Sequence, residues 1–179
     1  MSERKPTLAT VWLDGCSGCH MSLLDMDERL LELADKVEVV YSPLVDNKIF
    51  PELVDITLVE GAVASEEDLI KIKKIRPHTN ILVSLGDCAV TSNIPGMRNP
   101  FGAQAILDRA YLENVTLTHP EPKSVIPKLL DRVRPVHEVV PVDVFVPGCP
   151  PAADVIYQTL VDLIAGKKPD SDIKQRFGA

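Results

Sequence analysis

The chain has 179 residues, of which 19 are basic and 26 acidic, and its formal net charge is −7. This acidic balance argues against nucleic acid or an anionic lipid surface as the main partner. A chain of this length most often forms one domain and buries a core without disulfide bonds. We therefore expect a single domain over residues 1–179, whose four cysteines are free for other chemistry.

The sequence contains no pattern that predicts membrane insertion or export. No stretch approaches the roughly 18 consecutive apolar residues of a membrane helix, and the charged segment over residues 1–7 lacks a secretory pattern. We expect a cytoplasmic protein. Disulfides are disfavoured in that reducing compartment, and cysteine pairs there point to metal or redox chemistry.

Apolar runs alternate with amphipathic segments along the chain. The runs predict strands over residues 8–13, 37–41, 55–60, 81–85 and 142–146, and helical spacing predicts helices over 20–36, 65–76 and 152–165. Ser65 is the expected N-cap of the second helix, because acidic residues follow it. The alternation predicts an α/β fold with a doubly wound, five-stranded parallel sheet and helices on both faces. The simplest topology is flavodoxin-like, with strand order 2-1-3-4-5.

Residues 91–141 interrupt this rhythm, because they separate two strands by about fifty residues and contain many prolines. We expect an elaborated connection with helices over 102–112 and 125–133 and with loops that serve a partner. The alternative is an ordinary variable insertion. The tail over residues 167–179 is expected to be loosely ordered.

Four cysteines follow three of the predicted strands. Cys16 and Cys19 lie in Gly-Cys-Ser-Gly-Cys after the first strand, Cys88 in Gly-Asp-Cys after the fourth, and Cys149 in Pro-Gly-Cys-Pro-Pro after the fifth. The carboxyl ends of parallel strands meet at one edge of a sheet, where ligands bind. The sequence therefore predicts that four thiols converge from three turns to form a metal or cluster cage.

Four thiolates suit either an iron-sulfur cluster or structural zinc. Zinc sites usually draw on two paired knuckles, whereas this chain has one Cys-x-x-Cys and two isolated cysteines. A cluster also gains from backbone N–H groups in glycine turns, which tune its potential. The spacing favours a cluster and leaves zinc open. A thioredoxin-like dithiol at Cys16 and Cys19 is a further alternative, but it leaves Cys88 and Cys149 unexplained.

Four motifs together carry a family resemblance. In order they are Trp-Leu-Asp-Gly-Cys-Ser-Gly-Cys-His-Met-Ser, Val-Glu-Gly-Ala-Val, Gly-Asp-Cys-Ala-Val and Val-Pro-Gly-Cys-Pro-Pro. Over about residues 8–163 the chain resembles the small subunit of nickel-iron hydrogenases, and more narrowly the short small subunit of the cytoplasmic bidirectional NAD-reducing type. The related complex I subunit has adjacent cysteines in the first motif, whereas Ser17 and Gly18 separate them here.

The resemblance implies that Cys16, Cys19, Cys88 and Cys149 ligate one 4Fe-4S cluster, proximal to a nickel-iron centre in the large subunit. The chain would pass electrons from that centre to iron-sulfur and flavin diaphorase subunits, as part of a hydrogen:NAD+ oxidoreductase. Because there is no fifth cysteine, we expect one cluster only. NAD is not expected in this chain, which lacks a Gly-x-Gly-x-x-Gly fingerprint. A flavodoxin-like topology could accept FMN at the same strand ends, but FMN is not expected because the thiols and the cluster would compete for that space.

Two other functions fit the same residues. One is a hydrogenase small subunit that delivers electrons to a ferredoxin or a deazaflavin protein. The other is a stand-alone iron-sulfur or zinc module that senses redox state.

Glu60 is the candidate catalytic residue outside the cysteines. It ends the third strand in Val-Glu-Gly, where members of the resembled family also carry a glutamate, and a carboxylate beside the cage is suited to proton transfer. The alternative is that Glu60 accepts hydrogen bonds from loop N–H groups or lies at a subunit interface. His20 is expected to cap or pack rather than to bind metal.

Overall fold

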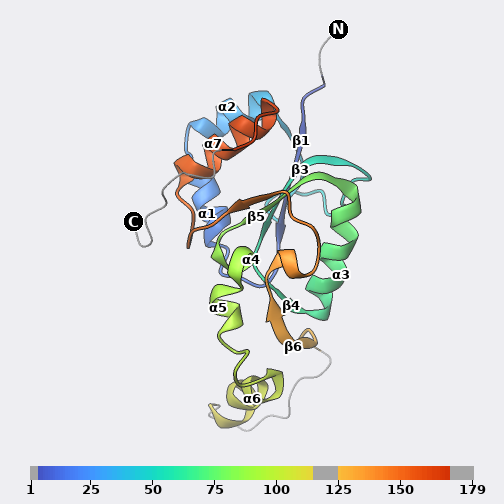
Figure 1. Cartoon of the computed structure of the whole chain (residues 1–179), viewed down its shortest axis with the longest axis vertical. Coiled ribbons are helices and arrows are strands. Elements are labelled where there is room, and N and C mark those ends of the chain that lie inside the picture. Colours follow the sequence, from blue (N-terminus) through green and yellow to red (C-terminus); the bar gives the residue numbers. More distant parts are fainter. Residues whose placement is uncertain (1–3, 115–124, 170–179) are drawn as a thin grey trace.

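The computed structural model describes residues 4–114 and 125–169. Its main element is a five-stranded sheet in the order β2-β1-β3-β5-β7, with every pair parallel (Figure 1). The strands are β1 (Thr7–Trp12), β2 (Glu38–Tyr41), β3 (Val54–Glu60), β5 (Thr79–Leu85) and β7 (Val144–Val146). These are the five strands expected from the sequence, and their order matches the expected 2-1-3-4-5.

Helices cover both faces of this sheet, as expected for a doubly wound α/β fold. One face carries α1 (Gly18–Leu24), α2 (Arg29–Lys36) and α7 (Ala153–Ile164). The other carries α3 (Glu66–Ile75), the short α4 (Asp87–Thr91) and the 3-10 turn η3 (Val136–Glu138). Figure 1 shows α1, α2 and α7 on one side of the strands and α3 on the other.

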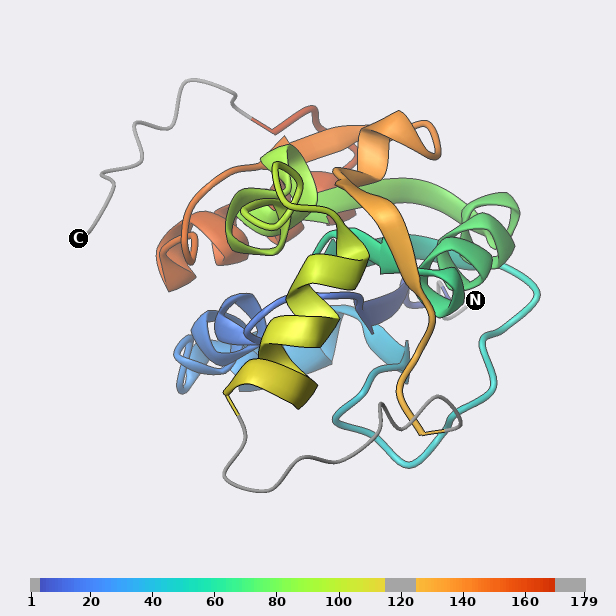
Figure 2. The same ribbon diagram turned by 90° about the horizontal axis from the view of Figure 1, so that it is seen from below.

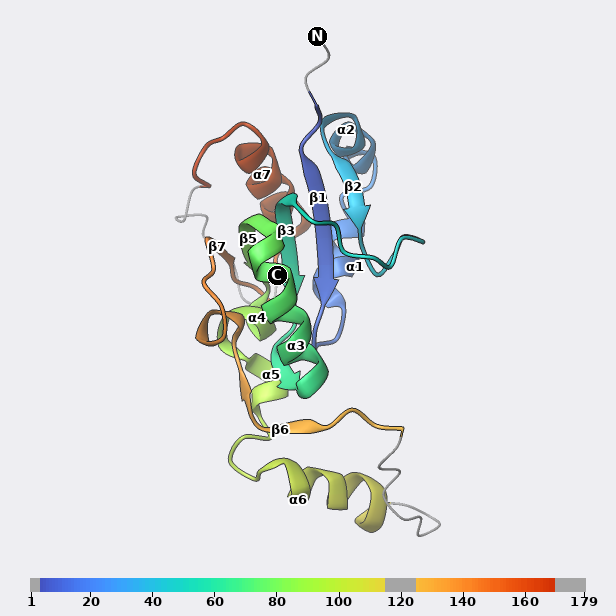
Figure 3. The same cartoon turned by 90° about the vertical axis from the view of Figure 1, so that its right-hand side faces the viewer.

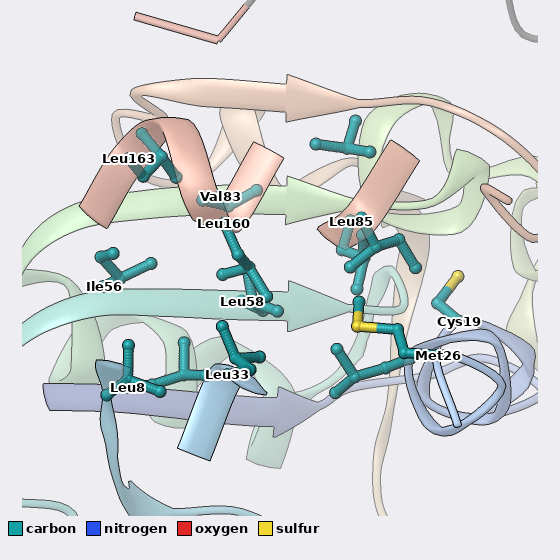
Figure 4. Close-up of a cluster of buried hydrophobic side chains, with 14 residues drawn as sticks. Leu8, Cys19, Met26, Leu33, Ile56, Leu58, Val83, Leu85, Leu160 and Leu163 are labelled. Atoms are coloured by element: carbon teal, nitrogen blue, oxygen red, sulfur yellow. The ribbon is translucent and has the colours of Figure 1, made fainter. Parts of the chain in front are cut away.

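The hydrophobic core has a layer on each face of the sheet. Leu58, Val83 and Leu85 from the strands pack with Leu33 and Leu160 from the helices in the first layer (Figure 4). Val11, Val59 and Leu82 face the second layer, where Ile72 and Val136 cover them. Because both faces are buried, the strands appear in the sequence as continuous apolar runs rather than as alternating patterns.

Helix α3 begins where its sequence predicts. The Ser65 hydroxyl accepts a hydrogen bond from Asp68 N at 3.1 Å, and the Asp68 carboxylate accepts one from Ser65 N at 3.0 Å. This reciprocal pair is a capping box, which satisfies two backbone donors at the helix start.

The single helix expected over residues 20–36 is wrong, because α1 ends at Leu24 and α2 begins at Arg29. Asp27 between them has a φ of 52°, which ends helical geometry. The turn places Met26 in the core with only 2% of its surface exposed (Figure 4). Burial of this side chain therefore accompanies a helix break that apolar spacing alone did not indicate.

In the long connection, the expected helix over 102–112 is confirmed, whereas the helix over 125–133 is wrong. The first is α6 (Ala103–Asp108), which continues as a π-helical turn over Arg109–Glu113. In place of the second, β6 (Leu129–Arg134) pairs antiparallel with β4 (Val63–Ser65), a strand that the sequence did not predict. The partner strand and the contacts of Asn99 with both backbone groups of Val133 decide this conformation.

The connection forms an arm at one end of the molecule. Helices α5 (Asn93–Gly96) and α6 lead away from the sheet, and β6 returns beside them (Figures 1 and 3). Figure 2 shows the arm from its far end, with α6 in front of the sheet. Residues 115–124 and most of the expected loose tail, residues 170–179, lie outside the described part of the chain. Within residues 4–114 and 125–169, no helix combines the length and the apolar character needed to cross a bilayer.

Leu160 lies on the buried side of α7 and has no exposed surface. The core packing therefore predicts that truncating this side chain strongly destabilises the fold. Leu160→Ala should lower the free energy of unfolding by about 2–5 kcal/mol, because it removes buried methyl groups and leaves a cavity. Leu31→Ala on α2 is the control: Leu31 is 73% exposed, and its loss should change that free energy by less than about 0.5 kcal/mol. Chemical denaturation measures both, and equal effects would contradict this assignment of the core.

Candidate functional site

The structure brings the four cysteines to the carboxyl edge of the sheet. Cys16 lies in the turn after β1, Cys19 in the first turn of α1, Cys88 in α4 after β5, and Cys149 in the turn after β7. Figure 4 shows Cys19 beyond the arrowheads of the strands. Cys19 and Cys88 are buried, whereas Cys16 and Cys149 are exposed. The cysteines thus form the edge of a site that opens to the outside.

A hollow of about 210 Å³ lies in front of these cysteines. Its lining includes Cys16, Cys88 and Cys149, together with Asp14, Gly15, Ile94 and Pro95. On its rim, Asn93 Nδ2 donates to Cys149 Sγ across 3.4 Å. The hollow therefore has thiols on several sides and one N–H donor directed at a sulfur, and hydrogen bonds of that kind tune the potential of a bound cluster.

Burial determines the protonation of the two inner cysteines. It raises the pKa of the Cys19 thiol far above its usual value, and the charges of Glu60, Cys88, Cys16 and Cys149 raise it further. Burial likewise raises the pKa of Cys88 to about 11, although a hydrogen bond from the backbone of Ile94 lowers that pKa in part. Both thiols keep their protons near neutral pH in the metal-free chain, so a metal must displace those protons when it binds.

Gly86 makes room for the sulfur of Cys19. Its φ is 81°, and a Cβ built on it would collide with Cys19 Sγ. A side chain here would both strain the backbone and displace that sulfur. The glycine of Gly-Asp-Cys therefore lets the Cys88 turn approach the Cys-x-x-Cys turn closely.

The turn after β3 holds the first cysteine turn in place. Asp14 and Ala62 exchange backbone hydrogen bonds, with Asp14 N to Ala62 O at 3.1 Å and Ala62 N to Asp14 O at 2.7 Å. Gly61 permits this approach, because a Cβ there would lie 2.7 Å from the carbonyl carbon of Leu13. The Val-Glu-Gly-Ala-Val motif thus fixes the path of the chain just before Cys16.

Glu60 ends β3 with only 3% of its surface exposed, and its carboxylate faces the start of α1. It accepts hydrogen bonds from Cys19 N at 3.3 Å and from His20 N at 3.0 Å, and it makes a short contact with His20 Nδ1. His20 is fully buried, and its Nε2 has no partner among the described residues. The carboxylate accepts from N–H groups in the first turn of α1 rather than from a loop, and it also has a titratable neighbour in His20.

Three polar residues of the edge were missed by the sequence analysis. Ser22 on α1 donates to Pro151 O at 2.5 Å, Asn93 donates to Cys149, and Asp87 binds the backbone of Gly148. Of the three, only Asp87 could have been identified from the local sequence, because it is an acidic residue between a glycine and a candidate ligand. The partners of Ser22 and Asn93 lie far away in sequence, so only the fold identifies these contacts.

The site fits a cluster of several metal atoms better than a single ion. A zinc ion would need its sulfur ligands about 2.3 Å away, and within the described residues no three His, Cys, Asp or Glu side chains are arranged around such a point. Three thiols that line an open hollow, a fourth thiol close behind them, and hydrogen bonds from Asn93 to Cys149 and from the backbone of Ile94 to Cys88 suit an iron-sulfur cluster.

Comparisons with known proteins agree with this description. The family described as "NADH ubiquinone oxidoreductase, 20 Kd subunit" matches residues 16–163. The chain is 44% identical to the NAD-reducing hydrogenase HoxS subunit delta of Cupriavidus necator, over 94% of this chain and 83% of that protein. It is 31% identical to the iron-sulfur subunit of an F420-non-reducing hydrogenase of Archaeoglobus profundus, over 90% of this chain but only 57% of that protein.

A solved structure is similar over nearly the whole chain. The crystal structure of an NAD+-reducing NiFe hydrogenase in the H2-reduced state contains a chain with a TM-score of 0.89 and 38% identity. The match covers 97% of this chain and 99% of that one. The α/β fold with its parallel sheet is therefore that of a known subunit.

Gly86→Ala tests the close approach at the cysteine edge. We expect it to lower the affinity for bound iron by roughly 10- to 100-fold, the range for changes just outside a metal's ligands. Gly102→Ala is a matched control, because Gly102 has nearly the same φ, 82°, but nothing within 4 Å of its Cβ position. Iron and acid-labile sulfide in the purified protein measure the effect. Equal losses in both variants would mean that backbone strain, not the Cys19 sulfur, is responsible.

Proposed function

Because this chain belongs to the family of the NADH ubiquinone oxidoreductase 20 kDa subunit and the nickel-iron hydrogenase small subunits, we propose that it is the small subunit of an NAD-reducing nickel-iron hydrogenase. In that enzyme it is the electron-transferring subunit. Its role is to connect the hydrogen-cleaving site of the large subunit with a diaphorase module that reduces NAD+.

The family includes iron-sulfur subunits, and the cofactor proposed for this chain is one 4Fe-4S cluster bound by Cys16, Cys19, Cys88 and Cys149. When bound, such a cluster accepts and releases one electron at a time. The observation that carries this proposal is that Cys16, Cys88 and Cys149 line one hollow at the carboxyl edge. Cys19 lies close enough to them for their charges to raise the pKa of its thiol. The nickel-iron centre belongs to the partner, and no flavin is proposed in this chain.

Partners are expected to cover the cysteine edge. Cys16 and Cys149 are exposed there, and exposed apolar side chains extend from the hollow along the arm. Ile94 lines it at 62% exposure, and Met97 and Phe101 follow along the arm with 66% and 69% of their surface exposed. Apolar groups gathered in this way mark protein interfaces. They support a position between the hydrogenase large subunit and an iron-sulfur/flavin diaphorase subunit; the cytoplasmic location stays a prediction.

The role of Glu60 in proton transfer belongs to the same proposal. Its carboxylate lies against His20 Nδ1, so the pair offers a proton acceptor and a proton donor in contact, next to the Cys19 turn. Both groups are shielded from bulk water. Burial next to another titratable group is typical of residues that transfer protons, although structural pairs have it as well.

Metal analysis of the native complex tests the function directly. We expect about four irons and four acid-labile sulfides per copy of this chain, beyond those of the partner subunits. Nickel and hydrogen-dependent NAD+ reduction should be present in the same anaerobic preparation. One zinc and no sulfide on this chain would contradict the proposal and indicate a structural or sensing module. A complete cluster without NAD+ reduction would point to another electron acceptor.

Glu60→Gln separates the catalytic role of this residue from its structural one. The amide keeps an oxygen that accepts from the start of α1 but cannot carry the proton, so hydrogen-dependent NAD+ reduction should fall by about 100-fold or more. Iron content should stay at the wild-type value. Glu38→Gln, at an exposed carboxylate on β2, is the control. Activity within a few-fold of the wild type would show that Glu60 serves only as a hydrogen-bond acceptor.

A further inference from the structure

The pairing of β5 with β7 continues past the ends of both strands and into the cysteine turns. Leu85 lies opposite Val146 at the end of the regular ladder. Beyond it, Gly86 N donates to Val146 O at 2.7 Å and Asp87 N donates to Gly148 O at 2.8 Å. The residue before Cys88 therefore contacts the residue before Cys149.

One backbone acceptor is missing from this extension. In a continuing parallel ladder the N–H of Gly148 would face the carbonyl of Gly86. That carbonyl already accepts from Ala89 N and Val90 N at 3.1 Å each, because α4 begins at this point. A buried N–H left without an acceptor is destabilising, so another group must take its place.

The side chain of Asp87 supplies that acceptor. Its Oδ1 accepts from Gly148 N at 2.7 Å, and its own N–H donates to the carbonyl of the same glycine. Asp87 is 8% exposed, so water does not compete freely for these bonds. The aspartate thus holds Gly148 at two points and ties the Cys88 turn to the Cys149 turn.

Few other backbone contacts are possible at the Cys149 turn. The next two residues, Pro150 and Pro151, have no N–H to donate. Among the described contacts of this turn, Ser22 reaches the carbonyl of Pro151 and Asn93 reaches the sulfur of Cys149. The backbone just before Cys149 is therefore held mainly by Asp87.

We propose that Asp87 is a positioning residue for the cluster, whose carboxylate fixes Cys149 relative to Cys88. This inference rests on the proposed function, because it assumes that both cysteines are ligands. Asp87 acts through Gly148 and does not itself bind the metal. Its negative charge also lies close to two ligands, and a negative charge near a cluster favours the oxidised form and lowers the reduction potential.

The same pair of strands provides a matched control. At the opposite end, the carboxylate of Asp143 accepts from Leu82 N at 2.8 Å, so an aspartate also links β5 to β7 there. This link is remote from the cysteine edge. Asp143 directly precedes β7, and Asp143→Ala removes this carboxylate-to-backbone bond together with an ion pair to Arg76 at 3.2 Å. It leaves the turns of Cys88 and Cys149 intact.

The experiment compares Asp87→Ala, Asp87→Asn and Asp143→Ala in the anaerobically purified complex. The readouts are the rate of iron release to a chelator, the EPR spectrum of the reduced cluster, and its midpoint potential. Asp87→Ala should release the cluster iron roughly 10- to 100-fold faster than the wild type and alter the EPR spectrum. Asp87→Asn keeps an acceptor oxygen and should retain iron as the wild type does, with a higher midpoint potential. Asp143→Ala should lower thermal stability only.

The outcomes separate a failure of the positioning role of Asp87 from a failure of the proposed function. Iron release from Asp87→Ala no faster than from Asp143→Ala would overturn the positioning role. So would an Asp87→Asn variant that loses iron as fast as Asp87→Ala, since the acceptor oxygen is then shown to be irrelevant. If the wild-type complex lacks about four irons assignable to this chain, the proposed function fails, and this inference fails with it.

Discussion

Parallel pairing of the strands in one register is the constraint on which the cysteine edge depends. Trp12 lies opposite Glu60, Glu60 opposite Leu85, and Leu85 opposite Val146, so four strands end in one row. The cysteine turns follow β1, β5 and β7 after that row, and the turn of Gly61 follows β3. A slip of one residue would move a turn by about 3.3 Å and exchange the faces of its side chains. Burial of both sheet faces resists such a slip, and the core thereby sets the positions of the thiols.

Buried polar contacts then join turns that the sheet only brings near one another. Glu60 binds the backbone at Cys19, Asp87 binds the backbone of Gly148, and Ser22 reaches Pro151. Each of these contacts links segments that are at least 41 residues apart in the chain. A buried polar group without its partner is costly, so these contacts favour one arrangement of the turns over its alternatives. The rigidity that a cluster needs from its ligands comes from this network together with close glycine contacts.

The four cysteines of the edge also differ in how exposed they are. Cys19 and Cys88 are buried, and their raised pKa values disfavour free thiolates. Cys16 and Cys149 are exposed and line the same hollow as the apolar side chain of Ile94. This asymmetry suits a metal centre that has buried ligands on one side and is covered by other subunits on the other side. Electrons leaving such a centre would cross the exposed side, where partner proteins can approach closely.

The sequence by itself determined the five strands, their order and the N-cap at Ser65, because continuous apolar runs, right-handed crossovers and capping residues are local or near-local signals. It also predicted that Cys16, Cys19, Cys88 and Cys149 share one edge, since carboxyl ends of parallel strands must meet. Only the tertiary structure decided the helix break at Asp27, the pairing of β6 with β4, and the contacts of Asp87 and Asn93. These features depend on partners distant in the chain, and apolar spacing carries no information about which backbone groups such partners will satisfy.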